Sequence, residues 1–158
     1  MTTPPLEKMI DESQIIDLKA TTKDEAIKEL VDVITTSDLI EDKEEFLRAI
    51  IEREKVISTG VGIGIALPHV KIPCVKDFVA AVGRSHKGID FDSLDEHPVN
   101  LIVMIGASDR QSGEFLKILA KLMLKLKNKE IRKRIMLAKT PKDIKTILCS
   151  EEYQNSMN

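Results

Sequence analysis

Three short apolar runs rich in Val and Ile, set between stretches of helical pattern, most constrain how this chain can fold. The runs are Gly62–Leu67, Phe78–Gly83 and Val99–Ile105, each bounded by Gly, Pro or Asp residues. Runs of this length and composition are typical of strands buried on both faces. Turns are expected at Gly88–Asp92 and Asp95–Pro98, and a further short strand at Ser13–Leu18.

Amphipathic helices are predicted before and after these strands. Apolar residues recur there at intervals of three and four, and Thr or Asp residues stand where N-caps are needed. The predicted helices are Lys23–Thr35, a segment from Asp42 to near Lys55, a segment beginning at Gly113, Glu130–Ala138, and a last segment with Thr140 as its cap and Pro141 at its first position. The predicted fold class is α/β: a three-layer sandwich whose mixed β-sheet is flanked by helices on both faces.

The length of the chain, 158 residues, is that of one compact domain. No repeat, low-complexity segment or Pro/Gly/Ser-rich linker divides it. We therefore expect a single domain over residues 1–158, with an ordered core of about 6–150. The core is expected to lie between a loose start at Thr2–Pro5 and a polar end at Glu151–Asn158.

Several features point to the cytoplasm as the expected location. No window is apolar enough to cross a bilayer, and Met1–Asp11 lacks the core of a signal peptide. The two cysteines, Cys74 and Cys149, have no metal-ligand spacing and cannot form a framework of bridges. We expect a reducing compartment and no membrane insertion.

The net charge of −2 hides an asymmetry along the chain. Seven basic and fifteen acidic residues lie up to Glu54, against seventeen basic and eleven acidic residues from Lys55 onward. A basic patch could meet nucleic acid or an acidic partner. The simpler interpretation is that Lys117, Lys121 and Lys125 form the solvated stripe of an amphipathic helix. No nucleic-acid motif accompanies them and aromatic residues are scarce, so no nucleic-acid partner is expected.

The segment with the clearest chemical content is Arg53–His69, which reads REKVISTGVGIGIALPH. Its glycines allow close backbone approach or a positive φ. Pro68 fixes the backbone that enters His69, so this imidazole belongs to a rigid segment. A neutral imidazole nitrogen is a competent nucleophile towards a phosphoryl donor.

A phosphoryl group on His69 would need donors and positive charge around it. Ser58, Thr59 and Gly60 are candidates for phosphoryl-binding support, and Arg53 is a candidate for charge stabilisation. Phosphoryl transfer asks a protein mainly for positioning and electrostatics. This set of residues meets that need without a metal or a cofactor.

Other interpretations of the same residues remain open at this point. A nucleotide loop should follow a strand and open a helix, which Pro68 interrupts. A zinc site would have to be built from the four metal-binding residues His69, Cys74, His86 and His97, whose spacing matches no standard pattern. A buried structural histidine is as well supported by the local pattern as a reactive one. His86 and His97 lie in polar surroundings typical of surface turns.

The run STGVGIGIALPH, followed by VKIP, VAAVGRS and GIDFD, resembles the fructose/mannitol/nitrogen-regulatory class of enzyme IIA domains of bacterial phosphotransferase systems. The resemblance extends from the first helix to about Leu148. It implies an α/β fold and a phosphohistidine at His69. The phosphoryl group would come from a small histidine phosphocarrier protein. In transport members the group then passes to a cysteine of a IIB domain and on to a sugar. Arg53 stands at the arginine position of the family.

The sequence departs from the family at one functional position. Members usually carry a second histidine at the start of a helix in a run such as H-L-x-x-L-A-x-L, and here Phe115 stands in its place. In one interpretation the second histidine only supports the first, and its loss weakens transfer. In the other, the protein has shifted towards signalling.

Two functions are therefore expected from the resemblance. The first is a phosphocarrier in fructose- or mannitol-type sugar uptake, with a IIB component as acceptor. The alternative is a stand-alone regulator of the nitrogen-regulatory type, which binds partner proteins according to its phosphorylation state. A third reading is a binding domain whose site is silent.

Overall fold

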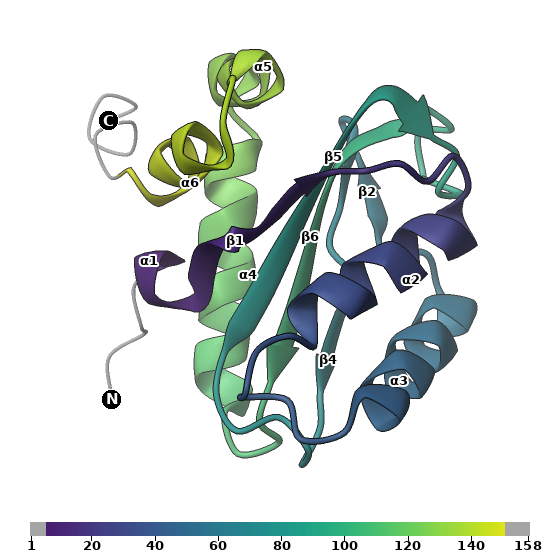
Figure 1. Ribbon diagram of the computed structural model, residues 1–158. Helices are drawn as coiled ribbons and strands as arrows, with labels where there is room; N and C mark the ends of the chain where they lie inside the picture. Colours follow the sequence, from purple (N-terminus) through teal and green to yellow (C-terminus); the bar gives the residue numbers. More distant parts are fainter. Residues whose placement is uncertain (1–5, 151–158) are drawn as a thin grey trace.

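The computed structural model describes residues 6–150 and has three layers, with a mixed β-sheet between two layers of helices (Figure 1). The helices are α1 (Leu6–Met9), α2 (Lys23–Ile34), α3 (Lys43–Val56), α4 (Ser112–Leu126), α5 (Lys129–Leu137) and α6 (Pro141–Cys149). The strands are β1 (Ile10–Asp17), β2 (Gly60–Gly62), β3 (Ile65–Ala66), β4 (His69–Lys71), β5 (Val79–Ile89) and β6 (Val99–Ala107). The predicted α/β fold class is confirmed. The loose ends expected at Thr2–Pro5 and Glu151–Asn158 lie outside the described residues.

The sheet has six strands in the order β1-β5-β6-β3-β2, and β4 also pairs with β6. The pairs β1–β5, β3–β6 and β4–β6 are parallel, whereas β5–β6 and β2–β3 are antiparallel. Strands β3 and β4 thus lie end to end along β6. The interruption falls at Leu67 and Pro68, because proline has no N–H to give to a ladder.

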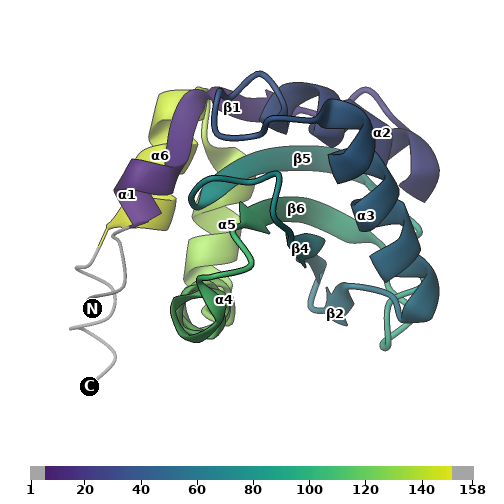
Figure 2. The same cartoon turned by 90° about the horizontal axis from the view of Figure 1, so that it is seen from below.

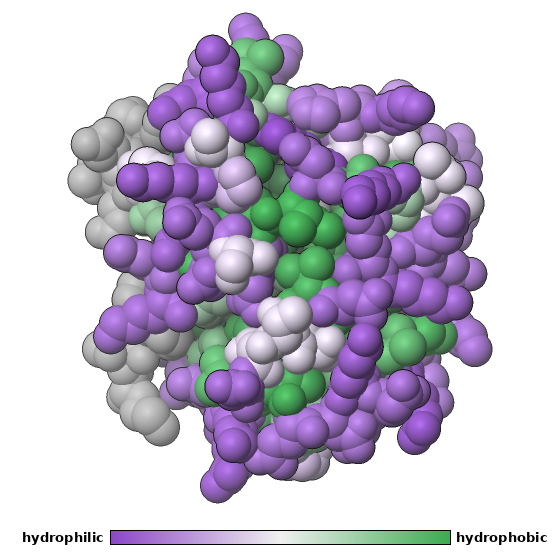
Figure 3. All heavy atoms as spheres, in the orientation of Figure 1, coloured by the Kyte–Doolittle hydropathy of each residue, from purple (hydrophilic) through white to green (hydrophobic). Residues whose placement is uncertain are grey.

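The two faces of the sheet carry separate apolar cores. Helices α2 and α3 pack on one face, around Leu30, Phe46 and Met104. Helices α1, α4, α5 and α6 pack on the other face, around Ile105, Leu122 and Ile135. Figure 2 shows the sheet edge-on between these two layers. Figure 3 shows polar side chains over the helices, with apolar atoms mainly in a band between the layers.

The helices begin where the sequence provides caps. The side chains of Thr22, Asp42 and Thr140 accept hydrogen bonds from backbone N–H groups three residues later, which satisfies free donors of the first turn. Asn128 caps α5 in the same way. The helices predicted near these residues are confirmed within a few residues of their ends, whereas α1 was not predicted.

The prediction of one continuous strand over Gly62–Leu67 is wrong. The chain instead forms a hairpin of β2 and β3, and Ile63 and Gly64 make the turn. Gly62 and Gly64 have φ values of +92° and +77°, which glycine adopts without steric cost. Ile63 also has a positive φ, +53°, which is uncommon for a β-branched residue.

Two further sequence expectations need correction. His86 is exposed as expected, but it lies within β5, which runs on to Ile89 and so includes the first two residues of the turn predicted at Gly88–Asp92. The lysine stripe predicted on α4 is only partly solvated, because Lys125 is 3% exposed and its ammonium group donates to the backbone carbonyl of Ser150. His97 lies in an exposed loop, as expected. Among residues 6–150, no helix is both long and apolar enough to cross a membrane.

Candidate functional site

His69 is the first residue of β4, a strand that lies between helix α3 on one face of the sheet and helix α4 on the other (Figure 2). The strand holds it because His69 pairs with Ile105 of β6, and the N–H of Ile105 donates to the carbonyl of Pro68 at 2.9 Å. The preceding N–H, that of Leu67, donates to the carbonyl of Thr59 at 3.0 Å. The backbone on both sides of the imidazole is therefore fixed by hydrogen bonds.

The two ring nitrogens of His69 are in different environments. Nδ1 lies 2.6 Å from the carbonyl oxygen of Leu67. A carbonyl oxygen only accepts, so Nδ1 carries the proton and the neutral ring keeps its lone pair on Nε2. Nε2 has no hydrogen-bond partner among residues 6–150 and is not one of their buried unpaired polar atoms, so it is open to solvent.

The pKa of His69 lies below its ordinary value of 6.5, mainly because the ring is partly buried. The positive charge of Arg53 lowers this pKa further, whereas the Leu67 carbonyl and the charge of Glu54 raise it. The lowering effects win. The ring is therefore mostly neutral near pH 7, with Nε2 available as a nucleophile.

Two cationic side chains lie around His69. Arg53 comes from the last turn of α3, and its guanidinium donates to the carbonyl of Ile57 at 3.2 Å, at the end of the same helix. Lys71 is two residues after His69 on β4, so both side chains leave the same face of the strand. The ammonium group of Lys71 donates to the hydroxyl of Ser112, the first residue of α4, at 2.8 Å. The charge of Arg53 thus acts on the imidazole, and that of Lys71 lies on the same face of β4 at the start of α4.

Phe115 lies against the imidazole from the first turn of α4. The ring centroids of His69 and Phe115 are 5.5 Å apart and their planes are tilted by 57°. Phe115 is 7% exposed and belongs to the apolar core beneath α4. Position 115 therefore contributes an apolar wall to the site and no hydrogen-bond donor.

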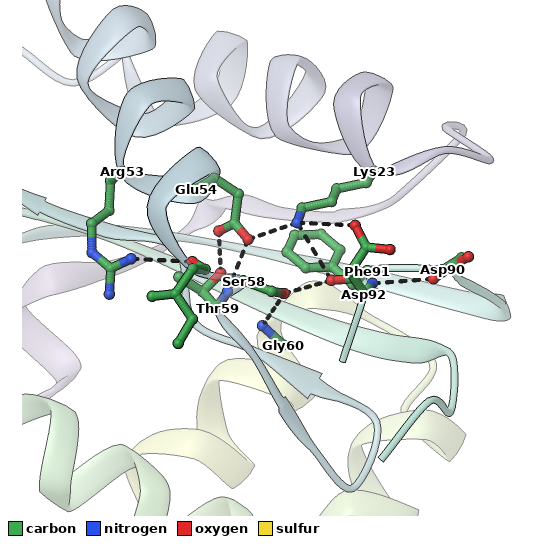
Figure 4. A network of polar contacts seen from close by, with 10 residues as sticks. Lys23, Arg53, Glu54, Ser58, Thr59, Gly60, Asp90, Phe91 and Asp92 are labelled. Carbon is green, nitrogen blue, oxygen red and sulfur yellow. Dashed lines mark hydrogen bonds and ion pairs between the residues drawn. The ribbon is translucent and has the colours of Figure 1, made fainter. Parts of the chain in front are cut away.

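A buried carboxylate, that of Glu54, organises the other side of α3 (Figure 4). Its two oxygens accept the N–H of Thr59 at 2.8 Å and the hydroxyl of Thr59 at 2.5 Å. The ammonium group of Lys23 lies 2.8 Å from the same carboxylate and 4.8 Å from the ring centroid of Phe91. A buried charge is tolerated only when it is paired and hydrogen-bonded in this manner. In Figure 4, Arg53 and Glu54 leave α3 in different directions.

The donors expected to hold a phosphoryl group are engaged within the protein. The Ser58 hydroxyl donates to the carbonyl of Phe91 at 2.5 Å and accepts the N–H of Gly60 at 3.1 Å. Both donors of Thr59 go to Glu54. A direct contact of Ser58, Thr59 and Gly60 with a phosphoryl group therefore stays a prediction, and in this structure their donors serve the protein itself. These residues hold the segment that leads to His69.

Sequence reasoning missed two residues of the site. Lys71 could have been found, because a basic residue two positions after His69 on a strand must share its face. Glu54 gave no such signal, since an acidic residue in an amphipathic helix is usually solvated. Its burial depends on Lys23 and Thr59, which only the tertiary structure brings together.

The remaining candidate residues do not join the site. Within the described part of the chain, no three His, Cys, Asp or Glu side chains lie close enough together to hold a metal ion. The four residues considered for a zinc site therefore do not form one in this structure. Cys74 and Cys149 are both free, and burial raises the pKa of each thiol. Neither is an activated thiolate near neutral pH.

Several known proteins are similar to this chain in sequence. The chain is 34% identical over 127 residues to the "PTS system fructose-specific EIIA component" of Haloferax volcanii, covering 80% of this chain and 82% of that protein. It is 30% identical over 132 residues to the "Nitrogen regulatory protein" of Bradyrhizobium diazoefficiens, covering 83% and 85%. Against the fructose-specific EIIABC component of Bacillus subtilis it is 35% identical over 125 residues, which are 79% of this chain but only 20% of that protein.

Solved structures share the fold. The crystal structure of nitrogen regulatory protein IIA-Ntr from Neisseria meningitidis superposes with a TM-score of 0.84 at 29% identity, covering 90% of this chain and 98% of that one. The IIA mannitol structure from Escherichia coli gives 0.75 at 21% identity, with 88% and 98% covered, and shows the fold alone. The family described as "Phosphoenolpyruvate-dependent sugar phosphotransferase system, EIIA 2" matches residues 8–151. The chain, with its imidazole set between two helices and open at Nε2, belongs to this EIIA 2 family.

Proposed function

We propose that the chain is a phosphocarrier that takes a phosphoryl group onto Nε2 of His69 from a small histidine phosphocarrier protein and passes it to a IIB component in fructose- or mannitol-type sugar uptake. The contact between Nδ1 and the Leu67 carbonyl carries this proposal. It fixes the tautomer whose lone pair is on Nε2, the nitrogen that has access to solvent. A general base is not needed, because the attacking nitrogen is already unprotonated.

In the proposed forward step, the Nε2 lone pair attacks the phosphorus of the donor's phosphohistidine. The new N–P bond forms as the donor's N–P bond breaks, and the donor's imidazole takes back its electron pair. In the second step a cysteine thiolate of the IIB component attacks the same phosphorus, and the bond to Nε2 breaks. No oxidant, reductant or metal takes part in either step.

The charges around His69 fit this chemistry. The transferred group spreads negative charge over its oxygens, and positive side chains stabilise that charge. Arg53 and Lys71 supply it in this chain. Ser58, Thr59 and Gly60 contribute by positioning rather than by contact, through the path from Glu54 to Thr59, from Thr59 to Leu67, and from Leu67 to His69.

The surroundings of His69 also fit docking of partner proteins. Val56 and Ile57 end α3 and are 80% and 58% exposed, and Leu116, next to Phe115, is 67% exposed. Exposed apolar side chains rimmed by charge are typical of protein interaction sites. One solved structure with the same fold, at 21% identity, is of a complex of enzyme IIAMTL and phosphorylated enzyme IIBMTL from Escherichia coli.

A regulatory function is the second candidate. Two relatives with nitrogen-regulatory names favour it, at 30% and 29% identity. Phe115 favours it too, because a site without a second donor is suited to slower uptake of the phosphoryl group. In this function the phosphorylation state of His69 would control binding to partner proteins.

Reconstituted transfer tests the proposal. The chain is incubated with phosphoenolpyruvate, enzyme I and the small phosphocarrier, and then with purified IIB protein. Acid-labile, base-stable label on the chain that moves to IIB supports sugar uptake. Label that stays on the chain in the presence of IIB favours the regulatory candidate. A folded chain that takes no label refutes both.

A further inference from the structure

A cavity separate from the His69 site opens beside the β2–β3 hairpin, beneath α5. Its volume is about 300 Å³, and Ile65, Leu101 and Met136 form part of its apolar floor. Ile65 pairs with Leu101 of β6, whereas His69 pairs with Ile105, four residues further along that strand. The cavity and the imidazole are thus about 13 Å apart along β6.

Three cationic side chains line this cavity, namely Lys129, Arg132 and Lys133, and no carboxylate lines it. No ion pair joins any of the three to an acidic residue among residues 6–150. The guanidinium of Arg132 is held in place because it donates to the carbonyls of Leu126 and Lys127, each at 2.8 Å, at the end of α4. The guanidinium of Arg132 is therefore fixed, and among residues 6–150 none of the three cations is neutralised by an ion pair.

We propose that this cavity binds a small organic anion with an apolar body, such as a medium-chain carboxylate. The hydrocarbon would lie over Ile65, Leu101 and Met136, and the anionic group would meet Lys129 and Lys133. The volume is at the lower end of the range for small-molecule sites, which are mostly apolar with a few polar groups that fix orientation. Charge complementarity selects the anion, and the apolar floor excludes a simple hydrated ion.

The position of the cavity gives the bound anion a route to His69. One wall is the turn at Ile63 and Gly64, where Ile63 has a φ of +53° and its N–H donates to the carboxylate of Asp95 at 3.0 Å. The chain continues from this turn through Ile65 to Leu67, whose carbonyl accepts Nδ1–H of His69. An occupant that shifts the turn therefore changes the hydrogen bond between the Leu67 carbonyl and the imidazole. The effect of this change on phosphoryl transfer rests on the proposed function.

Binding is tested on the unphosphorylated protein, so that the result does not depend on phosphoryl transfer. The ¹⁵N-labelled chain is titrated with octanoate, with octanol as the uncharged control and with acetate as the control without an apolar body. Octanoate is expected to shift the amides of Ile63–Ile65, Leu101 and α5 saturably, and to bind at least about tenfold more tightly than either control. Equal shifts with octanol, or shifts without saturation, overturn the proposal.

Matched variants locate the anion. Lys129→Gln with Lys133→Gln is expected to weaken octanoate binding about tenfold or more. Lys117→Gln with Lys139→Gln removes two exposed charges outside the cavity and should leave binding unchanged. Equal affinity in the two double variants contradicts the assignment. An acidic peptide that shifts the same amides where octanoate does not would assign the surface to a protein partner and likewise overturn it.

A second readout tests the route to His69. With octanoate bound, the half-life of the phosphohistidine is expected to change at least about twofold in the wild type and not in the Lys129/Lys133 variant. Octanoate binding with an unchanged half-life contradicts the coupling. Failure of the chain to take up phosphate at all would instead contradict the proposed function and leave the binding result standing.

Discussion

The Nδ1 atom of His69 lies 2.6 Å from the backbone carbonyl oxygen of Leu67, two residues earlier in the chain. This single contact sets the tautomer of the imidazole and points its reactive nitrogen away from the backbone. The hydrogen bond is possible because Pro68 interrupts the strand between the two residues, so that the Leu67 carbonyl is free of the ladder. The tautomer of His69 therefore depends on the interruption of the strand at Pro68.

Arg53→Ala is expected to slow phosphoryl transfer by roughly ten- to a hundredfold, because a charge-assisted contact contributes about 1.5–3 kcal/mol. Because Arg53 lowers the pKa of His69, the same variant should raise that pKa. Phosphorylation kinetics and an NMR titration of His69 measure the two effects. Arg53→Lys should keep the pKa low but recover only part of the rate. Wild-type values of both in folded Arg53→Ala would show that Arg53 is only a surface charge.

Glu54→Gln is expected to lower the pKa of His69, the opposite of Arg53→Ala, because Glu54 raises it. It should also reduce the free energy of unfolding by about 1–3 kcal/mol, since the Lys23 ammonium loses its buried charged partner. NMR titration and urea unfolding are the measurements. Glu52→Gln, an exposed position on the same helix, is the matched control. Equal effects of the two substitutions on the pKa of His69 and on the free energy of unfolding would show that Glu54 does not position the segment before His69.

Local signals account for what the sequence predicted correctly. Thr22, Asp42 and Thr140 mark helix starts through their own side chains, and the periodicity of the helices follows from burying one face. The Pro68–His69 pair could be recognised because the restriction that proline imposes is local.

What the sequence did not predict depends on contacts between distant residues. The run from Gly62 to Leu67 has the composition of one buried strand, yet positive φ values at Gly62, Ile63 and Gly64 fold it into a hairpin. The hydroxyl of Ser58 donates to the carbonyl of Phe91, 33 residues away, and no feature of the sequence pointed to this contact. Such competition for donors cannot be read from spacing.

Phe115→His is expected to raise the rate of phosphorylation or lengthen the phosphohistidine half-life by roughly fivefold, as one added hydrogen bond contributes about 1 kcal/mol. The reason is geometric, because the ring at position 115 already contacts His69. A loss of stability is also expected, because Phe115 is only 7% exposed. Stopped-flow phosphorylation and thermal unfolding measure the two effects.

Phe115→Leu separates the donor from the lost ring. It removes the aromatic contact without adding a hydrogen-bond donor, so it should lose stability without gaining rate. If Phe115→His gains no rate while both variants lose similar stability, position 115 is core alone and does not serve the phosphoryl group.

Acid should destabilise the fold through His69. Its pKa is lower in the folded chain than the 6.5 of an unperturbed histidine, so below that pH the unfolded chain binds more protons and stability falls as the pH falls towards the folded pKa. His69→Gln should therefore lose less stability on acidification across this window than the wild type. Urea unfolding from about pH 7.5 to 5 measures it. An identical slope in His69→Gln and the wild type would contradict the lowered pKa.

The nitrogen that carries the phosphoryl group is the most direct test of the account. The chain, labelled with ¹⁵N at its histidines, is phosphorylated with phosphoenolpyruvate, enzyme I and the small phosphocarrier, and its imidazole nitrogens are assigned by NMR. The expected result is one phosphohistidine, at Nε2 of His69, with Nδ1 still protonated and hydrogen-bonded to Leu67. Folded His69→Gln should take no phosphate. Phosphate on Nδ1 of His69, or on His86 or His97, would contradict the account.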